Sequence, residues 1–596
     1  MSDPKAKEAA AVERGNWGSR LGFVMAAAGS AVGLGNVWKF PYITGENGGG
    51  LFVIIYLCCI ALVGIPIMAA EIMIGRAAKK QPVAAFATLS GRKTGWTAVG
   101  WMGVLAGFVI LSFYMVVAGW AMDYTLKSIV NFSEPIHDAA EKKATVYRAT
   151  TPVAAMRARL AKRRAAHRSR ALVDDIKREA PRSVWRGYAR YRAAVGVAGG
   201  AGRAALLGEK KLAAQVVRAE ALQKRVDAAR EAAAVEAVTY YRKRSDDQVR
   251  AEAETVERRR IIAKKIGGAF GKLVTDGWTV TFWSALFMLL TILVVAGGIS
   301  SGIERTCRFL MPTLIALMGF MVVYGAFQSG FGEALTFVFK PDPHRLKASG
   351  VLEALGHAFF TLSLGMGAMI TYGSYQEGKD NIIKQSLWIA GVDTVVALLA
   401  CLMIFPIIFS YGQEPGAGPG LVFKSMPLAF AEIGSGGMLL AILFFGLLLV
   451  AALTSAISML EVVASYFIDV RGWSRPRAAW ILGIVIFAFG LPSVFAFDPD
   501  FVLKSWEPTY GKSFFDTMDY LASNWMLPLG GLFVSIYAGW VLPKKIRDAE
   551  LEGVAPITVR GWLLLVRWVA PILVIAVLLQ KVGVLDIDEI LYALFN

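Results

Sequence analysis

The stretch AGSAVGLGNVWKFP, residues 28–41, lies inside an apolar run that is long enough to cross a membrane. Such a run should be helical, because only helices and closed barrels satisfy their backbone hydrogen bonds in lipid. The stretch nevertheless contains three glycines and a proline. In a helix interior, glycine costs about 1 kcal/mol and proline about 3 kcal/mol relative to alanine. The sequence therefore predicts a spanning helix that is interrupted within the membrane.

The whole chain has the composition of a membrane protein. Its 596 residues are 56% hydrophobic, with a mean hydropathy of +0.51. The apolar runs lack the strict alternation of barrel strands, so they predict an all-α helical bundle. Windows of about 20 apolar residues predict eleven spans, at 20–42, 50–75, 97–128, 277–297, 309–330, 352–375, 385–411, 437–468, 478–497, 517–542 and 562–586.

Loop charge predicts the orientation of these spans. Basic residues follow every even-numbered span, as Arg76, Lys79 and Lys80 follow the second. Lysine and arginine collect in short cytoplasmic loops, so we expect a cytoplasmic N-terminus and an extracytoplasmic C-terminus. The charged segment 1–19 leads directly into a full-length span and is not typical of a cleavable signal peptide. An Ala/Arg-rich composition favours a multi-pass protein of the bacterial inner (plasma) membrane.

A large basic insertion separates membrane spans 1–3 (20–132) from spans 4–11 (277–590). Residues 133–276 contain 33 Lys/Arg and 17 Asp/Glu, so the insertion carries +16 of the chain's +18. We expect an extracytoplasmic region of two or three long helices, with VGVAGGAGRAALLG (195–208) as the turn between them. Two interpretations stay open: a solvated helical hairpin without its own activity, or a surface for anionic lipid or an unknown partner. The confined charge does not indicate nucleic-acid binding by the membrane body.

A second interrupted stretch, FFTLSLGMGAMITYGSYQ at 359–376, lies in the sixth predicted span. Spans one and six begin two sets of five spans, and a repeat of odd length must be inverted relative to its copy. Glycine-interrupted helices at matching positions indicate a substrate site at the membrane midplane, because unwinding frees carbonyls for cations and helix N-termini for anions. The alternative is that glycine serves close helix packing.

Four stretches together carry a resemblance to the neurotransmitter:sodium symporter family. RLGFVMAAAGSAVGLGNVWKFPYITGENGGG (20–50), SSGIERTCRFLMPTL (300–314), the interrupted stretch of span six, and LLLVAALTSAISMLEVVASYFID (447–469) resemble its first, fifth, sixth and eighth helices. The resemblance covers about 14–130 and 277–590. It implies an inverted five-plus-five repeat of the leucine-transporter type, with discontinuous helices one and six and an eleventh span, in the bacterial amino-acid transporter branch.

By this resemblance the chain is a sodium-coupled symporter rather than an enzyme, and it binds two co-transported Na+ ions. Sodium is a hard cation that prefers oxygen ligands. The implied ligands of the first ion, besides the substrate carboxylate, are Ala31, Asn36, Thr361 and Asp393. The implied ligands of the second ion are Gly29, Val32, Ala451, Thr454 and Ser455. Hydroxyls in a buried helix can instead bond back to the preceding turn.

The implied substrate is a neutral L-amino acid, hydrophobic or aromatic, taken up by alternating access. Monoamine transporters of the family carry an aspartate at the position of Gly33, and the glycine leaves room for a substrate with its own carboxylate. Most of the implied pocket is apolar, and methionine adapts to differently shaped partners. The substrate-binding residues would be Ala31, Gly33, Gly35, Ile110, Tyr114, Phe360, Thr361, Ser363, Met366, Ser455 and Met459.

The resemblance also implies two gates and a substitute for chloride. Lys39 and Asp519 would close the outer side, and Arg14 and Asp469 the inner side. Asp393 stands where many members carry asparagine, and the serine that helps to hold chloride in some members is absent. A carboxylate within a membrane costs about 2.5–3.5 kcal/mol unless it is compensated, and sodium would compensate it. We therefore expect Asp393 to replace the anion and transport to be chloride-independent.

A non-transporting amino-acid sensor or receptor on the same fold is the alternative function. In such a protein the basic insertion would serve as the output module. Intact sodium ligands and two opposed gates favour transport, because a sensor has no need to cycle.

Overall fold

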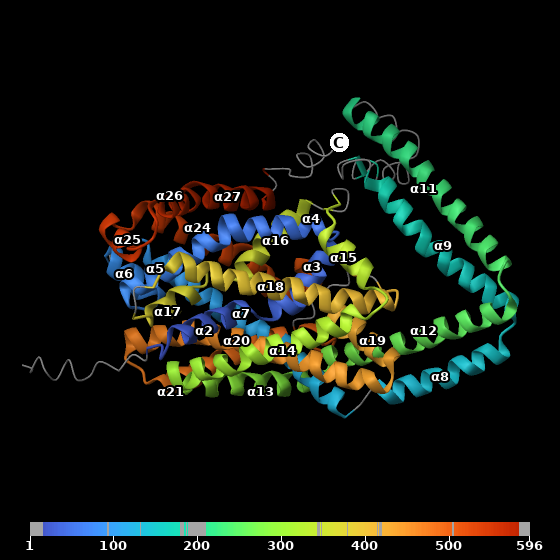
Figure 1. Ribbon diagram of the computed structural model, residues 1–596, viewed down its shortest axis with the longest axis horizontal. Coiled ribbons are helices and arrows are strands. Elements are labelled where there is room, and N and C mark those ends of the chain that lie inside the picture. Colours follow the sequence, from blue (N-terminus) through green and yellow to red (C-terminus); the bar gives the residue numbers. More distant parts are fainter. Residues whose placement is uncertain are drawn as a thin grey trace, which may run out of the picture. The chain divides into compact units, whose positions relative to one another are not determined.

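The computed structural model describes residues 16–91, 94–130, 133–178, 184–185, 188, 210–342, 346, 348–377, 380–413, 415, 420–502, 506–582 and 584. These residues form helices and turns, and none of them forms a strand (Figure 1). Their contacts separate two compact units. The first holds the described residues up to 134, from 265 to 342 and from 349 to 582, and the second chiefly residues 135–264.

Nine continuous helical segments of the described chain are long and apolar enough to cross a membrane. A tenth candidate is the bent pair at the N-terminus, where α2 (Arg20–Ala31) meets η1 (Gly35–Lys39) and α3 (Phe40–Glu46) at 42°. The nine are α4–η2–α5 (Gly50–Ala78), α7 (Thr97–Ile129), α13 (Gly277–Ala296), η3–α14 (Ile299–Ala326), α18 (Ile382–Ser410), α20 (Ser435–Arg471), α21–η6 (Arg475–Phe497), α23–η8–α24–η9 (Phe514–Val541) and α26–η10–α27 (Pro556–Lys581).

The sixth predicted span is a pair of short helices, α16 (Ala348–Thr361) and α17 (Ala368–Ser374). Neither is long enough to cross a membrane alone. Between them Ser363, Gly365 and Gly367 have positive φ values of 54°, 79° and 76°, a conformation that glycine adopts without steric cost. A Cβ on Gly365 would lie 2.2 Å from the carbonyl oxygen of Leu527. The interruption is therefore held in place by packing against α24 (Leu527–Ile536).

The first span is interrupted at the glycines that the sequence singled out. α2 begins behind Ser19, whose hydroxyl caps it by accepting the Gly22 N–H, and ends where Val32 turns to an extended conformation. The chain resumes as the π-helical turn η1, and the Asn36 N–H donates to the Gly33 carbonyl at 3.1 Å. Both interruptions predicted in the membrane are present.

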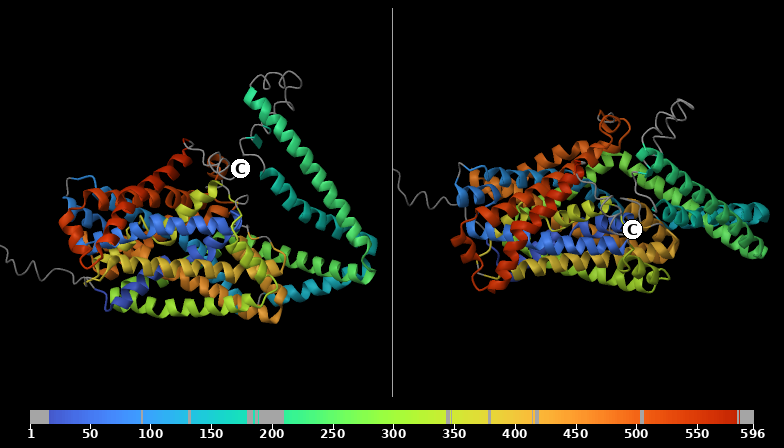
Figure 2. Two further views of the ribbon diagram at one scale, coloured as in Figure 1. Left: turned by 45° about the horizontal axis from the view of Figure 1, so that its top comes forward. Right: turned by 90° about the horizontal axis from the view of Figure 1, so that it is seen from above.

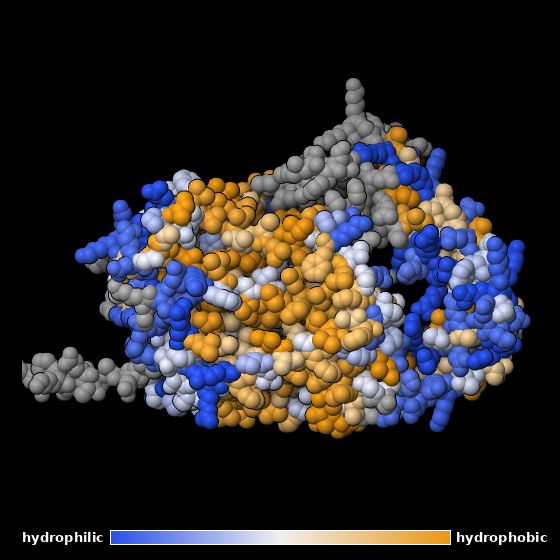
Figure 3. Space-filling view, in the orientation of Figure 1, coloured by the Kyte–Doolittle hydropathy of each residue, from blue (hydrophilic) through white to orange (hydrophobic). Residues whose placement is uncertain are grey.

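Long helices of the first unit pack against one another. α7 packs along α20, and α20 also contacts α2, so spans three and eight lie together beside the first span (Figure 1). Figure 3 shows hydrophobic side chains gathered over the face that α14 and α18 present, where Phe309, Phe320, Trp388 and Val395 are exposed.

Short helices connect the spans. They are α6 (Pro82–Ser90), α15 (Phe331–Phe339), η5 (Leu421–Ser425), α19 (Met426–Ile433), α22 (Trp506–Tyr510) and α25 (Lys544–Glu550).

The described residues of the second unit lie mainly in four long helices, α8 (Ser133–Thr150), α9 (Val153–Arg178), α11 (Lys210–Arg242) and α12 (Asp246–Thr275), the last of which continues into the first unit. The expectation of two or three was too low. Pro152 separates α8 from α9, because proline cannot continue a helix. Ser245 separates α11 from α12, since its hydroxyl accepts the Gln248 N–H at 3.3 Å and starts the next helix. The turn expected at 195–208 lies outside the described residues.

The helices of the second unit share a small core. α9 and α11 run side by side (Figure 2), because alanine and larger apolar residues recur on their facing sides. The core residues are Met156, Leu160, Ala161, Ala237, Tyr241, Val249 and Ala253.

Candidate functional site

The two interrupted spans enclose a small cavity together with α7 and α20. The volume of the cavity is about 10 Å³, which is enough for about one water molecule. All eleven residues that the sequence assigned to substrate binding line it. Ser30 lines it too and was missed; its hydroxyl donates to Ser458 at 2.8 Å. The structure brings the predicted residues together, and their roles stay predictions.

Gly33 forms one wall of the cavity because it has no side chain. A Cβ at this position would lie 2.1 Å from the Ser455 Oγ and 3.1 Å from the Tyr114 hydroxyl. The Tyr114 hydroxyl accepts the Leu34 N–H at 3.2 Å, so its own proton is available to an oxygen atom in the cavity. Glycine is thus required sterically where the first helix is interrupted.

The residues predicted for the first sodium ion meet around Asp393. The Asn36 amide donates to the Asp393 Oδ1 at 2.8 Å and to its carbonyl at 3.0 Å. The Thr361 hydroxyl donates to Oδ1 at 2.9 Å, and the Tyr56 hydroxyl to Oδ2 at 3.3 Å. Asp393 is fully buried, and none of its described partners is a basic side chain. The arrangement is a buried carboxylate that neutral donors stabilise and a bound cation would neutralise.

The residues predicted for the second ion lie where α2 meets α20. The Thr454 hydroxyl is 3.0 Å from the Ala451 carbonyl and 3.4 Å from the Val32 carbonyl of the other helix. The Ser455 hydroxyl donates to the Ser30 carbonyl at 3.2 Å. A Cβ on Gly29 would contact the Thr454 Cβ at 3.4 Å. Thr454 bonds back to its own helix and also faces α2, so several oxygens converge where a hard cation would bind.

The two residues predicted as the outer gate, Lys39 and Asp519, form an ion pair. The Lys39 ammonium is 3.0 and 3.3 Å from the two Asp519 oxygens and 3.4 Å from the Ser523 hydroxyl. It also lies 4.6 Å from the centre of the Phe360 ring. Lysine, ring and carboxylate thus meet beside the cavity, contributed by η1, α16 and α23 (Phe514–Leu521).

The segment before α2, where the inner gate is predicted, contacts several elements of the first unit. Arg14 lies outside the described residues, so the predicted pair with Asp469 stays a prediction; one Asp469 oxygen accepts the Gln81 N–H at 3.2 Å. The Trp17 indole donates to the Tyr372 carbonyl at 3.0 Å. Glu304 accepts the Gly18 N–H at 2.7 Å. These contacts attach the N-terminal segment to α17 and η3.

The sequence reasoning missed a buried acid that holds the second interruption. Glu71 of α5 (Ile65–Ala78) is fully buried, and its Oε1 accepts the Gly365 N–H at 2.7 Å. This bond satisfies a backbone donor that unwinding between α16 and α17 leaves free. An acidic residue in the apolar run IPIMAAEIMIG (65–75) was the available signal, because such residues are rare inside membranes and usually functional.

These features define a multi-pass helical membrane transporter, with a site between two interrupted spans and closing contacts on both sides. The chain belongs to the sodium:neurotransmitter symporter family, whose family model matches residues 14–151 and 242–592. It is therefore a sodium-coupled transporter. The match reaches further than 14–130 and 277–590 and includes α8 and α12, leaving 152–241 unmatched.

Known proteins support the assignment. The crystal structure of MhsT in complex with L-phenylalanine is 34% identical to this chain, with a TM-score of 0.68, and the match covers 95% of this chain and 99% of that one. The uncharacterized sodium-dependent transporter YhdH of Bacillus subtilis is 29% identical over 582 residues, 96% of this chain and 98% of YhdH. Sodium-dependent nutrient amino acid transporter 1 of Drosophila melanogaster is 22% identical over 596 residues, 93% of this chain and 81% of its own length.

The predicted fold class is thereby confirmed. The chain is an all-α membrane protein with an inverted five-plus-five repeat of the leucine-transporter type and an eleventh span. Helices one and six are the discontinuous helices of the two halves.

The eleventh span contacts, through Lys581, the turn beside the predicted outer gate. Its ammonium donates to the carbonyl of Asn524 at 3.0 Å and to the amide oxygen of the same residue at 2.6 Å. Asn524 lies in the π-helical turn η8 (Ala522–Met526), beside the Ser523 that contacts Lys39. We therefore expect Lys581 to position the predicted gate, because it binds the turn that carries Ser523.

Changing Lys581 to methionine should raise KM for substrate about tenfold or more, since hydrogen bonds to charged groups contribute about 1.5–3 kcal/mol. We expect kcat to change less, because the cavity itself is untouched. Lys581→Arg should restore KM, and the exposed Lys545→Met serves as the matched control. Concentration-dependent uptake measures both constants; an equal fall in the transport rate of all three variants would contradict the positioning role.

Proposed function

We propose that this protein carries a neutral L-amino acid, hydrophobic or aromatic, into the cell together with sodium. The observation that carries the proposal is the cavity between the two interrupted spans. Its lining combines glycines and hydroxyl-bearing residues of the interrupted spans with the apolar side chains of Ile110, Phe360, Met366 and Met459. A zwitterion with an apolar side chain has the complementary distribution of polar and apolar groups.

The backbone around Gly33 and the Tyr114 hydroxyl would bind the substrate carboxylate. Gly33 leaves space there, and the Tyr114 hydroxyl already accepts the Leu34 N–H, so it can donate to a carboxylate oxygen. The apolar side chain would lie against Met366 and Met459, and flexible methionines can move to widen a cavity this small. The L-phenylalanine bound to MhsT is a ligand of this class.

Two sodium ions would drive uptake. The first would lie beside Asp393, Asn36 and Thr361 and contact the substrate carboxylate, and the second would lie between α2 and α20. Two ions with a zwitterion carry a net charge of +2, and each charge is worth about 2.3 kcal/mol per 100 mV. The membrane potential alone would then support roughly three decades of accumulation.

Transport would not require chloride. The carboxylate of Asp393 supplies a fixed negative charge at the position where the first ion would bind. A carboxylate and a sodium ion neutralise each other in the membrane interior, so an additional anion has no charge to balance.

We place the protein in a bacterial inner membrane, with a cytoplasmic N-terminus and an extracytoplasmic C-terminus and insertion. The basic residues that follow the even-numbered spans support this orientation. The Lys39–Asp519 pair then faces outward, and the segment around Trp17 faces the cytoplasm.

Uptake into proteoliposomes tests the proposal. With an inward sodium gradient, labelled L-phenylalanine or L-leucine should accumulate about tenfold or more above the level without sodium. Unlabelled glutamate and lysine should compete poorly, and replacing chloride with gluconate should leave the initial rate unchanged. Binding without accumulation would favour the sensor alternative, and loss of uptake without chloride would contradict the role given to Asp393.

A further inference from the structure

The second unit has a groove of its own. It lies between α9 and α12, beside the end of α11, and has a volume of about 700 Å³. Binding sites for small molecules commonly occupy about 300–1,000 Å³. The residues of α9 and α11 that line the groove lie in the part of the chain that the family model does not match. The part of the groove that α9 and α11 form is therefore specific to this chain relative to the family model, whereas the part that α12 forms lies in the matched region.

Positive charge gathers on both long walls of the groove. Arg163, Arg164 and His167 line it from α9, and Arg244 and Arg259 line it from the opposite side. Glu252 is the one acidic side chain in the described lining. Like charges that converge in this way repel one another unless an anion lies between them.

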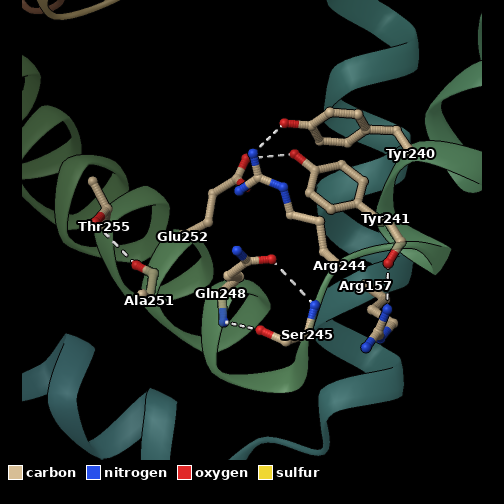
Figure 4. Close-up of polar contacts among 9 residues, drawn as sticks. All are labelled: Arg157, Tyr240, Tyr241, Arg244, Ser245, Gln248, Ala251, Glu252 and Thr255. Carbon is tan, nitrogen blue, oxygen red and sulfur yellow. Dashed lines mark hydrogen bonds and ion pairs between the residues drawn. The ribbon is translucent and has the colours of Figure 1, made fainter.

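The Glu252 carboxylate already has two partners within the unit. It forms a 3.4 Å ion pair with Arg244 and accepts a hydrogen bond from the Tyr241 hydroxyl (Figure 4). Burial and the contact with Glu252 raise the pKa of Tyr241 well above its ordinary value, so its hydroxyl stays protonated and donates. The acid thus neutralises Arg244 and leaves the α9 wall without a counter-charge.

The arginines of the groove are arranged around an aromatic ring. The Arg164 guanidinium lies 3.7 Å from the centre of the Tyr240 ring, and the Arg244 guanidinium lies 4.8 Å from it. Stacking on the ring fixes the plane of the Arg164 guanidinium and leaves its N–H edge free to donate, whereas Arg244 already donates to the Tyr240 hydroxyl and to Glu252. Among the described residues, no carboxylate pairs with Arg163, Arg164 or His167.

We propose that this groove binds a small polyphosphate anion, a molecule with two or more linked phosphate groups. Guanidinium groups match phosphate oxygens with two parallel hydrogen bonds. Two neighbouring guanidinium groups on the α9 wall favour a ligand with more than one negative charge, and a groove of about 700 Å³ is larger than a single phosphate. Arg163 and Arg164 donate to the ligand from α9, with His167 one turn further along.

Titration of the purified full-length protein with inorganic tripolyphosphate, followed by calorimetry, tests the site. Saturable binding of one equivalent is expected, and Arg163→Gln/Arg164→Gln should weaken it about tenfold or more. Arg163→Gln alone leaves the Tyr240 stack intact and should weaken binding severalfold, so the test survives if the double variant fails to fold. Lys142→Gln/Lys143→Gln on α8 removes the same charge from exposed positions outside the groove and is the matched control.

Two outcomes would overturn the proposal. Equal weakening in the α8 and α9 variants would mean that tripolyphosphate responds only to the overall charge of the unit. Flotation with phosphatidylglycerol vesicles that depends on Arg163 and Arg164, without measurable tripolyphosphate binding, would assign the groove to lipid headgroups instead. Sodium-driven uptake should be unchanged in every variant, which separates this site from the transport cavity.

Discussion

Asp393→Asn is expected to reduce sodium-driven uptake in chloride-free buffer about a hundredfold. Without the carboxylate the charge of the bound sodium ion is uncompensated, and an uncompensated charge at the centre of the membrane costs about 2.5–3.5 kcal/mol. Asparagine keeps nearly the same shape, and its amide oxygen can still accept from Asn36 and Thr361, which both donate to Oδ1, while its NH2 group would face the Tyr56 hydroxyl. The substitution thus removes the charge and leaves most of the local packing in place.

The chloride response of the variant distinguishes two roles of this carboxylate. If Asp393 replaces an anion, adding chloride should restore part of the uptake by the asparagine variant and should not affect the wild type. If the carboxylate serves only as a direct sodium ligand, chloride should have no effect, and the sodium concentration for half-maximal uptake should rise. The initial rate over a grid of sodium and chloride concentrations measures both quantities.

Asp123→Asn is the matched control, since Asp123 is also a buried acid in a span but pairs with Lys127 away from the cavity. We expect this variant to keep near-normal uptake and no chloride response. A similar loss in both variants would mean that any buried charge change disturbs the protein, and would contradict a specific role for Asp393.

The existence of the spans was predictable because the membrane fixes their length and their apolar composition. The interruptions were predictable because glycine clusters have few other uses within such runs. The start of the fifth span was not: apolar windows place it at 309, whereas the helical segment begins at Ile299. Charged residues, among them Glu304 and Arg308, lower the hydropathy at the start of this helix. In the structure these two side chains pair with each other and contact the N-terminal segment.

Contacts between distant parts of the chain could not be predicted from the composition and patterning of the sequence. Glu71 is recognisable as an unusual acid, but its bond to Gly365 joins residues 294 positions apart and depends on how α5 packs against α17. Ser30 carries an ordinary hydroxyl in a small-residue run, and only the structure places it on the cavity. The sodium ligands were named through the family resemblance, since spacing alone does not pair α2 with α20.

Gly33→Ala should raise the sodium concentration for half-maximal uptake and weaken substrate affinity, each by about five- to a hundredfold. Adding a methyl group to a filled interior typically costs about 1–3 kcal/mol. Here the new Cβ would lie 2.1 Å from the Ser455 Oγ, so that hydroxyl must rotate away. Rotation breaks its bond to the Ser30 carbonyl and removes one oxygen from the proposed second sodium site.

Gly107→Ala on α7 is the matched control, because its Cβ would have 3.6 Å to the nearest atom, the Met459 carbonyl oxygen, and should leave uptake nearly unchanged. A double-mutant cycle with Ser455→Ala isolates the cause of the Gly33→Ala defect. If the clash with Oγ is responsible, Gly33→Ala/Ser455→Ala should be little worse than Ser455→Ala alone, because the clashing atom is gone. If the two losses add in full, the methyl group acts elsewhere, for instance on the Tyr114 hydroxyl at 3.1 Å. Sodium-dependent binding and uptake on the four proteins of the cycle therefore test whether the first interruption and the second sodium site share one contact.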